Sequence, residues 1–176
     1  MGTIQQETFS PRIYVACLAA YNCGYLHGRW IEADQDADDI WREISEMLKT
    51  SPIEGAEEYA IHDYEDFAGI RVEEYSGIEH VRELAGFVTE HGQLGAALFD
   101  HYGDLATARE ALEESYCGVY RSLADYVEEL TTETTEIPES LRYYIDWESM
   151  ARDAELNGDF ITVTTAWDEV HVFWGR

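Results

Sequence analysis

The acidic residues of this chain are spread along its whole length instead of being gathered in one tail. Thirty-seven Asp and Glu residues stand against eleven Lys and Arg residues, which gives a formal net charge of −26 at pH 7. Because the acids are interleaved with Tyr, Trp, Leu and Ile, they do not form the aromatic-poor block of a disordered tail. Hydrophobic residues make up 45% of the chain, enough for a core, so the charge must coat a folded body.

That charge limits the partners of the protein. It repels nucleic acid and anionic lipid, so we expect neither direct nucleic-acid binding nor membrane association. It would attract a cationic protein groove from a distance. No stretch has the length and apolarity of a membrane span or a signal peptide. The three cysteines, an odd number without dense spacing, predict free thiols in a reduced, cytoplasmic protein.

No spacing pattern indicates a metal, a cofactor or a nucleophile. Cys17, Cys23 and His27 offer at most three donors without the paired spacing of a structural zinc site, so buried thiols are the simpler interpretation. Cys117 follows Glu113 and Glu114, whose charges disfavour a thiolate. We therefore expect no cofactor and no nucleophilic cysteine.

One carboxylate cluster could in principle serve an enzyme. Asp63, Glu65 and Asp66 lie in or just after a segment that is predicted as a strand. Strand alternation would place His62 and Tyr64 on one face and the carboxylates of Asp63 and Glu65 on the other, so the groups do not converge for acid–base chemistry. A solvated acidic face is the favoured interpretation.

The first half of the chain predicts a mixed domain. Residues 11–22 resemble a strand that returns as a hairpin through residues 25–33. Residues 36–49 predict a helix, with Asp36 or Asp38 as the N-cap and an apolar face of Ile40, Ile44, Met47 and Leu48. A strand follows near residues 57–67, with a turn at Gly69.

The middle of the chain predicts helices only. Ser76 and Glu79 have the spacing of a capping box in front of an apolar stripe, and Gly92 is a plausible helix stop. Residues 93–103 and 104–114 predict two further short helices.

Residues 104–130 allow two interpretations. One continuous helix would present an apolar stripe but carry Gly118 in its interior, at a cost of about 1 kcal/mol. We favour a helix, a short strand at residues 115–120 and a second helix that restarts at Ser122, because Ser122 and Asp125 have capping-box-like spacing.

The C-terminal segment predicts a helix and a strand pair. The helix would begin at Pro138, present Leu141, Ile145 and Met150 on one face, and stop at Gly158. Two β-branched and aromatic strands would follow, joined by a turn near Asp168. The predicted fold class is α+β, with a mixed N-terminal domain (residues 1–75), an all-helical middle (76–114) and a mixed C-terminal domain (115–176).

Four blocks of this sequence, in this order, resemble the ArdA family of antirestriction proteins. They are "IYVACLAAYNCGYLHGRWIE", "EEYAIHDYEDFAGIRVEEYSGIEHV", "EESYCGVYRSLADYVEEL" and "YYIDWESMARDAELNGDF", and they span about residues 12–160. Residues 111–126 resemble the segment that the family calls its antirestriction motif.

The resemblance implies a DNA mimic carried by mobile genetic elements. Family members are elongated chains of three small domains that form homodimers through their C-terminal domains. Their acidic surface occupies the DNA-binding groove of type I restriction–modification enzymes, on the methyltransferase core and its specificity subunit. Two chains at −26 would match the charge on about 90 Å of B-DNA, which carries one charge per roughly 1.7 Å.

Candidate residues follow from this hypothesis. We predict a distributed partner-binding surface made of acids in the first half of the chain: Asp36, Asp38, Asp39, Glu43, Glu46, Glu57, Glu58, Asp63, Glu65, Asp66, Glu73, Glu74, Glu79 and Glu83. We predict that the antirestriction motif instead builds the C-terminal core and the dimer interface, through Tyr116, Cys117, Gly118, Val119 and Tyr120.

Two other function classes compete with the mimic. An acidic surface with Lys49 as its only lysine could be an adaptation to high salt without a partner, an alternative that folding only in molar salt would favour. A carboxylate-cluster enzyme is the weaker alternative, because the sequence lacks a catalytic constellation.

Overall fold

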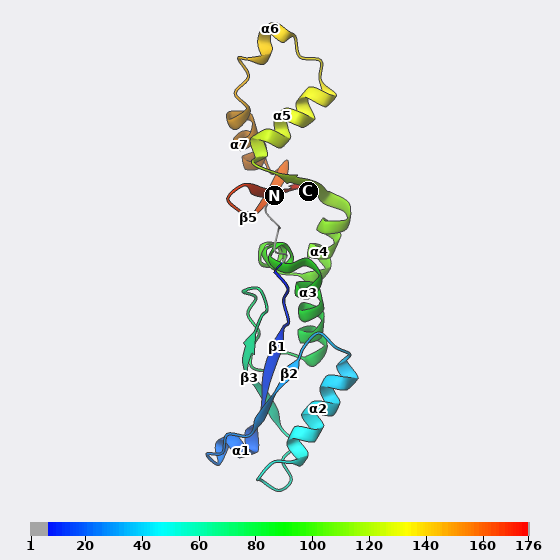
Figure 1. Cartoon of the computed structure of the whole chain (residues 1–176), viewed down its shortest axis with the longest axis vertical. Helices are drawn as coiled ribbons and strands as arrows, with labels where there is room; N and C mark the ends of the chain where they lie inside the picture. The colour runs from blue at the N-terminus through cyan, green and yellow to red at the C-terminus, as the bar shows by residue number, and fades with distance from the viewer. Residues whose placement is uncertain (1–6, 176) are drawn as a thin grey trace. The chain divides into compact units, whose positions relative to one another are not determined.

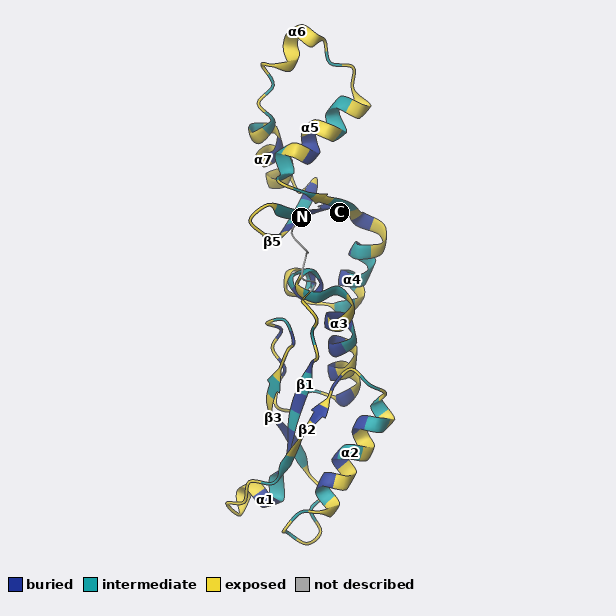
Figure 2. Cartoon of the chain, viewed as in Figure 1, coloured by how far each residue is buried: buried dark blue, intermediate teal, exposed yellow. Residues whose placement is uncertain are grey.

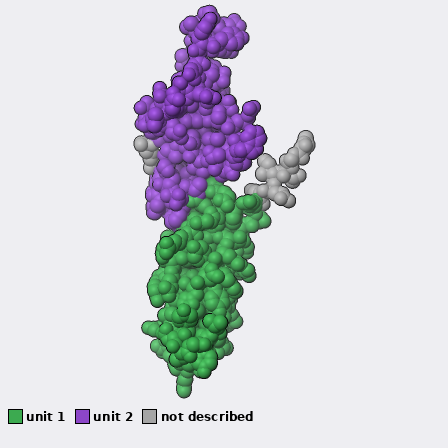
Figure 3. Space-filling model, turned by 90° about the vertical axis from the view of Figure 1, so that its left-hand side faces the viewer, with its two compact units in different colours: residues 1–96 green, residues 97–176 purple. Residues whose placement is uncertain are grey.

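The computed structural model describes residues 7–175, and its chain divides into two compact units (Figure 3). Unit 1 is Met1–Ala96 and unit 2 is Ala97–Arg176. Both contain helices and a small antiparallel sheet, so the predicted α+β class is confirmed (Figure 1). The finer division into three domains stays a prediction.

Unit 1 is built on a three-stranded sheet in the order β2-β1-β3. Its strands are β1 (Arg12–Cys17), β2 (Gly28–Glu32) and β3 (Tyr59–Glu65). Both neighbours run antiparallel to β1, which confirms the predicted hairpin. The predicted first strand is too long, because residues 18–22, which were predicted as part of it, form a short helix, α1 (Leu18–Asn22), in the hairpin connection.

A β-bulge interrupts the alternation of β3. Tyr14 pairs with Asp63 and Val15 pairs with Ile61, so His62 has no partner of its own on β1. The extra residue shifts the pleat, as bulges do. Strict alternation over residues 59–65 was therefore the wrong description of this strand.

Helix α2 (Ala37–Lys49) forms where the sequence predicts it. Ile40, Ile44 and Met47 are buried and recur at the spacing of one helical face. Asp36 occupies the N-cap position, although its side chain forms no capping hydrogen bond. Such a face ties the helix to the core of unit 1.

Helix α3 (Ile78–Tyr102) is interrupted at Gly92, where φ is 54° and ψ is −140°. The predicted stop at Gly92 is thus a break after which the helix resumes. The predicted capping box is wrong, because the helix begins at Ile78 and the Ser76 hydroxyl accepts from the Glu73 N–H instead.

The helix–strand–helix interpretation of residues 104–130 is confirmed. Helix α4 (Leu105–Glu110) continues into one π-helical turn, Ala111–Ser115, and then into strand β4 (Tyr116–Tyr120). Helix α5 (Leu123–Thr134) begins after Ser122, whose hydroxyl accepts from the backbone N–H of residue 125 at 3.1 Å.

The single helix predicted after Pro138 is wrong. The chain forms α6 (Glu139–Arg142), breaks, and restarts as α7 (Trp147–Asn157), with Asp146 accepting from the Ser149 N–H at the new N-cap. The start after Pro138 and the left-handed Gly158 at the end are as predicted. A second capping site inside the apolar pattern explains the break.

The sheet of unit 2 has the order β4-β6-β5, with β5 (Phe160–Ala166) and β6 (Glu169–Trp174) forming the predicted hairpin. Its core is small and lies between the sheet, α5 and α7; the buried residues are Tyr126, Val127, Ala151, Phe160 and Val172. Strand β4 is an edge strand in this unit.

Candidate functional site

The fourteen predicted acids all come from the surface of unit 1 (Figure 2). Asp39 and Glu43 are half-buried on α2, and the other twelve are exposed. They lie on α2, on β3 and the segment before it, on the loop that follows β3, and at the start of α3. Unit 1 therefore displays these carboxylates from several elements, as a distributed charge rather than as one converging cluster.

Arginines neutralise part of the α2 acids. Arg29 on β2 reaches across to α2, with Nη1 at 3.3 Å from Glu46 Oε2 and 3.8 Å from Glu43 Oε2. Within α2, Arg42 Nη1 lies 2.6 Å from Asp39 Oδ1. These carboxylates are already engaged with cations of their own chain, so they present less charge to a partner.

The acids around β3 also include some that are paired with arginines and others that are not. Arg12 binds Glu65, with Nε donating to Oε1 at 2.7 Å, and Arg71 Nε lies 3.1 Å from Glu73 Oε1. In the described part of the chain, eight of the predicted acids have no basic side chain within 4.0 Å; they are Asp36, Asp38, Glu57, Glu58, Asp63, Asp66, Glu79 and Glu83. Glu74 has only the His62 ring, 3.9 Å away.

Glu79 is held in place more firmly than most of these acids. Its Oε1 accepts from Trp41 Nε1 at 3.3 Å, which links α3 to α2. Its own backbone N–H, followed by Trp41, lowers the pKa of the Glu79 carboxyl. Glu79 thus keeps its negative charge to a lower pH than an ordinary glutamate, and its position is fixed by a neighbouring aromatic side chain.

The antirestriction motif has two faces in unit 2. Cys117 and Tyr120 pack against the core, and the Tyr120 hydroxyl donates to Glu129 Oε1 at 3.1 Å. Val119 is 52% exposed. Gly118 lies between Cys117 and Val119 and has a φ of 126°, a conformation that favours glycine. Part of the motif therefore builds the core, while Val119 faces outward.

Tyr116 joins the motif to the neighbouring strand β6. Its hydroxyl lies 2.8 Å from His171 Nδ1, and its ring stacks on that imidazole and packs against Phe173. His171 is buried, and its Nε2 lies 3.1 Å from Glu169 Oε1. Burial and Glu169 raise the pKa of the Tyr116 hydroxyl, so it stays a neutral hydrogen-bonding group. No local pattern predicts this pairing, because the two partners are 55 positions apart in the chain.

The burial of the three cysteines agrees only in part with the prediction from the sequence. Cys17 is buried and Cys117 is half-buried, but Cys23 is exposed, so the expectation of buried thiols is wrong for Cys23. Cys23 directly follows α1, at the turn that leads into β2. Among the residues that the structure describes, all three are free, and no group of His, Cys, Asp and Glu side chains could hold a metal ion.

The carboxylates of the possible enzyme site do not act together. Glu65 is bound by Arg12, and Asp66 accepts from the backbone N–H of Ser10 at 3.3 Å. Asp63 accepts from the N–H of Tyr64. Each carboxylate thus has its own local partner, so the three form no shared catalytic group.

The predicted partner-binding surface includes no acid of unit 2. Unit 1 contains nineteen acidic and six basic residues, and unit 2 contains eighteen and five, so each carries a formal charge of −13. A count of charges by unit would have shown this balance. None of the helices in residues 7–175 has the length and apolar character needed to cross a membrane.

Comparison with known proteins identifies the family. A family model described as antirestriction protein (ArdA) matches residues 13–169, which is most of the chain. A search of curated proteins gives no match. The family consists of inhibitors and not of enzymes, and it implies a type I restriction enzyme as the target. The chain therefore belongs to the ArdA family of antirestriction proteins.

Proposed function

We propose that this protein inhibits restriction by mimicking DNA, occupying the DNA-binding groove of a type I restriction–modification enzyme on its methyltransferase core and specificity subunit. The observation that supports this most directly is the exposure of acids from many elements in a chain of net charge −26. A cationic DNA groove is the partner that such a surface attracts.

Carboxylates can replace phosphates in such a groove. Arginine and lysine recognise both groups, and arginine can bind either with two parallel hydrogen bonds. Contacts to the DNA backbone carry no sequence information, so a mimic of the backbone would inhibit enzymes with different recognition sequences. The eight acids without a basic partner are the ones best placed to accept such bonds.

The proposal includes an assembly and a location. The protein acts as a homodimer in the cytoplasm, joined through unit 2, so that two acidic chains form one mimic. The three-domain division at residues 1–75, 76–114 and 115–176 belongs to the same proposal. The charge of two chains then corresponds to about 90 Å of duplex.

Competition with DNA tests the function. A labelled duplex is bound to a purified type I methyltransferase complex, and the protein is titrated in at several salt concentrations. We expect displacement of the duplex, with an affinity that falls steeply as salt rises because the contacts are ionic. Binding that leaves the duplex in place would contradict the mimic, and a protein that folds only in molar salt would favour salt adaptation.

A matched pair of variants tests the surface. The first neutralises five exposed acids of unit 1 without basic partners: Asp36→Asn, Asp38→Asn, Glu57→Gln, Glu58→Gln and Glu83→Gln. The control neutralises five exposed acids of unit 2: Asp100→Asn, Glu128→Gln, Glu133→Gln, Asp153→Asn and Asp168→Asn. Both lose the same charge.

The two variants separate local contacts from total charge. If the unit 1 acids contact the groove, the first variant competes more weakly than the control and has a smaller salt slope. Single substitutions should each have a small effect, since exposed ion pairs contribute little individually. Equal loss in both variants would show that total charge matters and not the predicted surface.

A further inference from the structure

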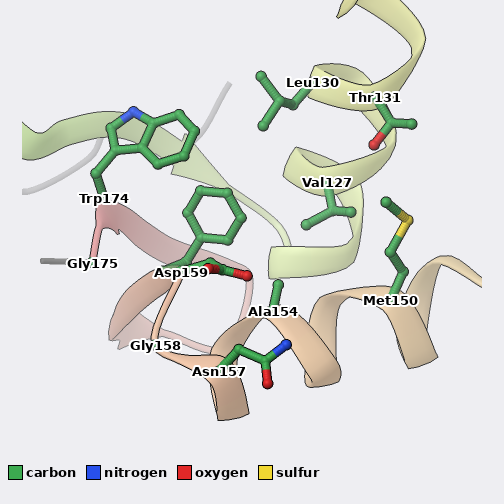
Figure 4. Close-up of a pocket in the computed structure, with 11 residues that line it drawn as sticks. Val127, Leu130, Thr131, Met150, Ala154, Asn157, Gly158, Asp159, Trp174 and Gly175 are labelled. Atoms are coloured by element: carbon green, nitrogen blue, oxygen red, sulfur yellow. The ribbon is translucent and has the colours of Figure 1, made fainter. Parts of the chain in front are cut away.

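An open apolar groove lies in unit 2 between α5 and α7, with a volume of about 530 Å³ (Figure 4). Val127 and Leu130 line it from α5, and Met150 and Ala154 line it from α7. The Trp174 ring closes one side of it, as Figure 4 shows. Pockets that bury small ligands are typically about 300–1,000 Å³, so the groove can receive several side chains.

The same unit carries an apolar segment that its own core does not cover. The arm, defined here as residues 135–146, joins α5 to α7 and includes α6 (Figure 1). Tyr143 and Tyr144 are 88% and 85% exposed, and Leu141 is 55% exposed. Because these side chains are largely in solvent, the arm does not fill the groove of its own chain. Large exposed apolar side chains that occur together mark interaction sites.

The central part of the arm and the groove have complementary charges. Residues 140–145 read SLRYYI and contain one cation, Arg142, and no acid, whereas the acids of the arm, Glu136, Glu139 and Asp146, lie on either side of this stretch. The groove is lined by one carboxylate, Asp159, and by no Lys or Arg. Most of the surface of a chain at −26 repels a second copy, so two copies can approach only where charge is low or opposite. Residues 140–145 of the arm and the groove meet that condition.

We propose that the arm of one copy occupies the groove of a second copy, with Leu141, Tyr143 and Tyr144 against the apolar lining and Arg142 beside Asp159. The inference rests on the homodimer of the proposed function and names the contact that joins it. Each copy has one arm and one groove, so a twofold dimer contains the contact twice. Tyrosine side chains in well-packed pockets are frequent anchors of such interfaces.

The first test removes the arm's anchors. Native mass spectrometry and sedimentation measure dimerisation of the full chain and of the double variant Tyr143→Ser with Tyr144→Ser. We expect dimerisation to weaken by at least about tenfold, since anchor residues of this kind contribute 1.4 kcal/mol or more. The control is Leu156→Ser with Trp167→Ser, two exposed apolar residues of unit 2 that lie outside the arm and the groove.

A variant of the groove provides the second test. Met150→Arg places a long cation on the groove wall, where it would meet Arg142 of the other copy. Met150 is 43% exposed, so the fold should tolerate the change, and circular dichroism checks this. We expect the same loss of dimer as for the arm variant.

Mixing the two variants gives the decisive result. The arm variant keeps an intact groove, and the groove variant keeps an intact arm, so an equimolar mixture can form one of the two contacts. We expect mixed dimers, identified by mass, that are weaker than the wild type but stronger than either variant alone. The absence of mixed dimers would overturn the proposal.

Charge reversal tests the contact by a different route. Arg142→Asp should weaken the dimer and Asp159→Arg should weaken it too, while both changes in one chain should restore part of the loss. Unchanged dimerisation in these variants and in the arm variant would overturn the proposal, as would an equal loss in the Leu156 and Trp167 control.

These results remain separate from the test of inhibition. A wild-type chain that stays monomeric overturns the arm contact, yet its competition with DNA can still be measured. A dimer that survives every arm and groove variant also overturns it, while the mimic function stands. Failure to displace DNA by an intact dimer contradicts the proposed function and leaves the arm contact supported.

Discussion

Units 1 and 2 carry the same formal charge of −13 but differ in how much core lies beneath it. Among the residues that the structure describes, twenty-two hydrophobic residues are buried in unit 1 and ten in unit 2. Within residues 7–175, unit 2 also exposes more large apolar side chains, nine against six. The comparison indicates that unit 1 buries more of its apolar side chains within one chain, whereas unit 2 has more apolar surface left for a partner.

The largest effect we expect comes from truncating a fully buried side chain of unit 2. Phe173 is fully buried, and Phe173→Ala should cost about 3–5 kcal/mol of unfolding free energy. We expect amide hydrogen exchange to accelerate in unit 2 and to stay unchanged in β1 to β3. The matched control, Phe87→Ala in unit 1, should give the reverse pattern. Equal acceleration in both units for either variant would break the comparison.

A smaller effect concerns the backbone of the antirestriction motif. At a φ of 126°, Gly118→Ala forces an unfavourable conformation, and its new methyl group meets the Tyr120 ring at 3.3 Å. We expect a loss of about 1–3 kcal/mol in unit 2, measured by chemical denaturation. Gly86→Ala, inside α3 of unit 1, is the control, because the nearest atom to its new methyl group is Asp34 Oδ1 at 3.5 Å, an ordinary contact, and the change should not destabilise the helix. If both glycines tolerate alanine, β4 is less constrained than its geometry indicates.

The cap of α5 should contribute less. Ser122→Ala removes the acceptor for the N–H of residue 125 and should cost about 1 kcal/mol, visible as a lower melting temperature of unit 2. Ser122→Asp keeps an acceptor and should restore most of that stability. A Ser122→Asp variant as unstable as Ser122→Ala would show that the hydroxyl has a role other than capping.

The smallest expected effect is a gain of binding. Arg29→Gln releases Glu43 and Glu46 from their cation, so competition with DNA for a type I enzyme should improve by no more than about 1 kcal/mol. Arg121→Gln, at an exposed position of unit 2, changes the net charge equally. An equal gain from both variants would mean that total charge decides binding and not which unit carries it.

Much of the fold could be predicted because the signals are local. The buried face of α2 follows from the spacing of Ile40, Ile44 and Met47, and the restart of α5 follows from Ser122. The break before α7 was missed because the apolar spacing of the predicted helix continues across it. Asp146, which caps the new helix, lies within that apolar stretch.

For the candidate site, the sequence could predict only that the surface is rich in acids. Exposed acids follow from the charge of a folded chain, and the sequence gives no way to tell which acids have a cation beside them. Arg29 lies on β2 and its partners on α2, so the pairing depends on how the helix packs on the sheet. The groove was missed for the same reason, since its walls come from α5, α7 and β6.

The strand orders of the two sheets also bear on how the protein forms during synthesis. The β2-β1-β3 sheet is complete once Glu65 has been made, and its neighbours are close in sequence. In unit 2, β4 must wait for β6 to reach Trp174 before it has any strand to pair with. Closing so long a loop is slow, and domains made first fold first. In a nascent chain, unit 1 would thus be folded while strand β4 of the antirestriction motif still has no partner strand. Pairing of this motif would therefore be one of the last steps in forming the functional molecule.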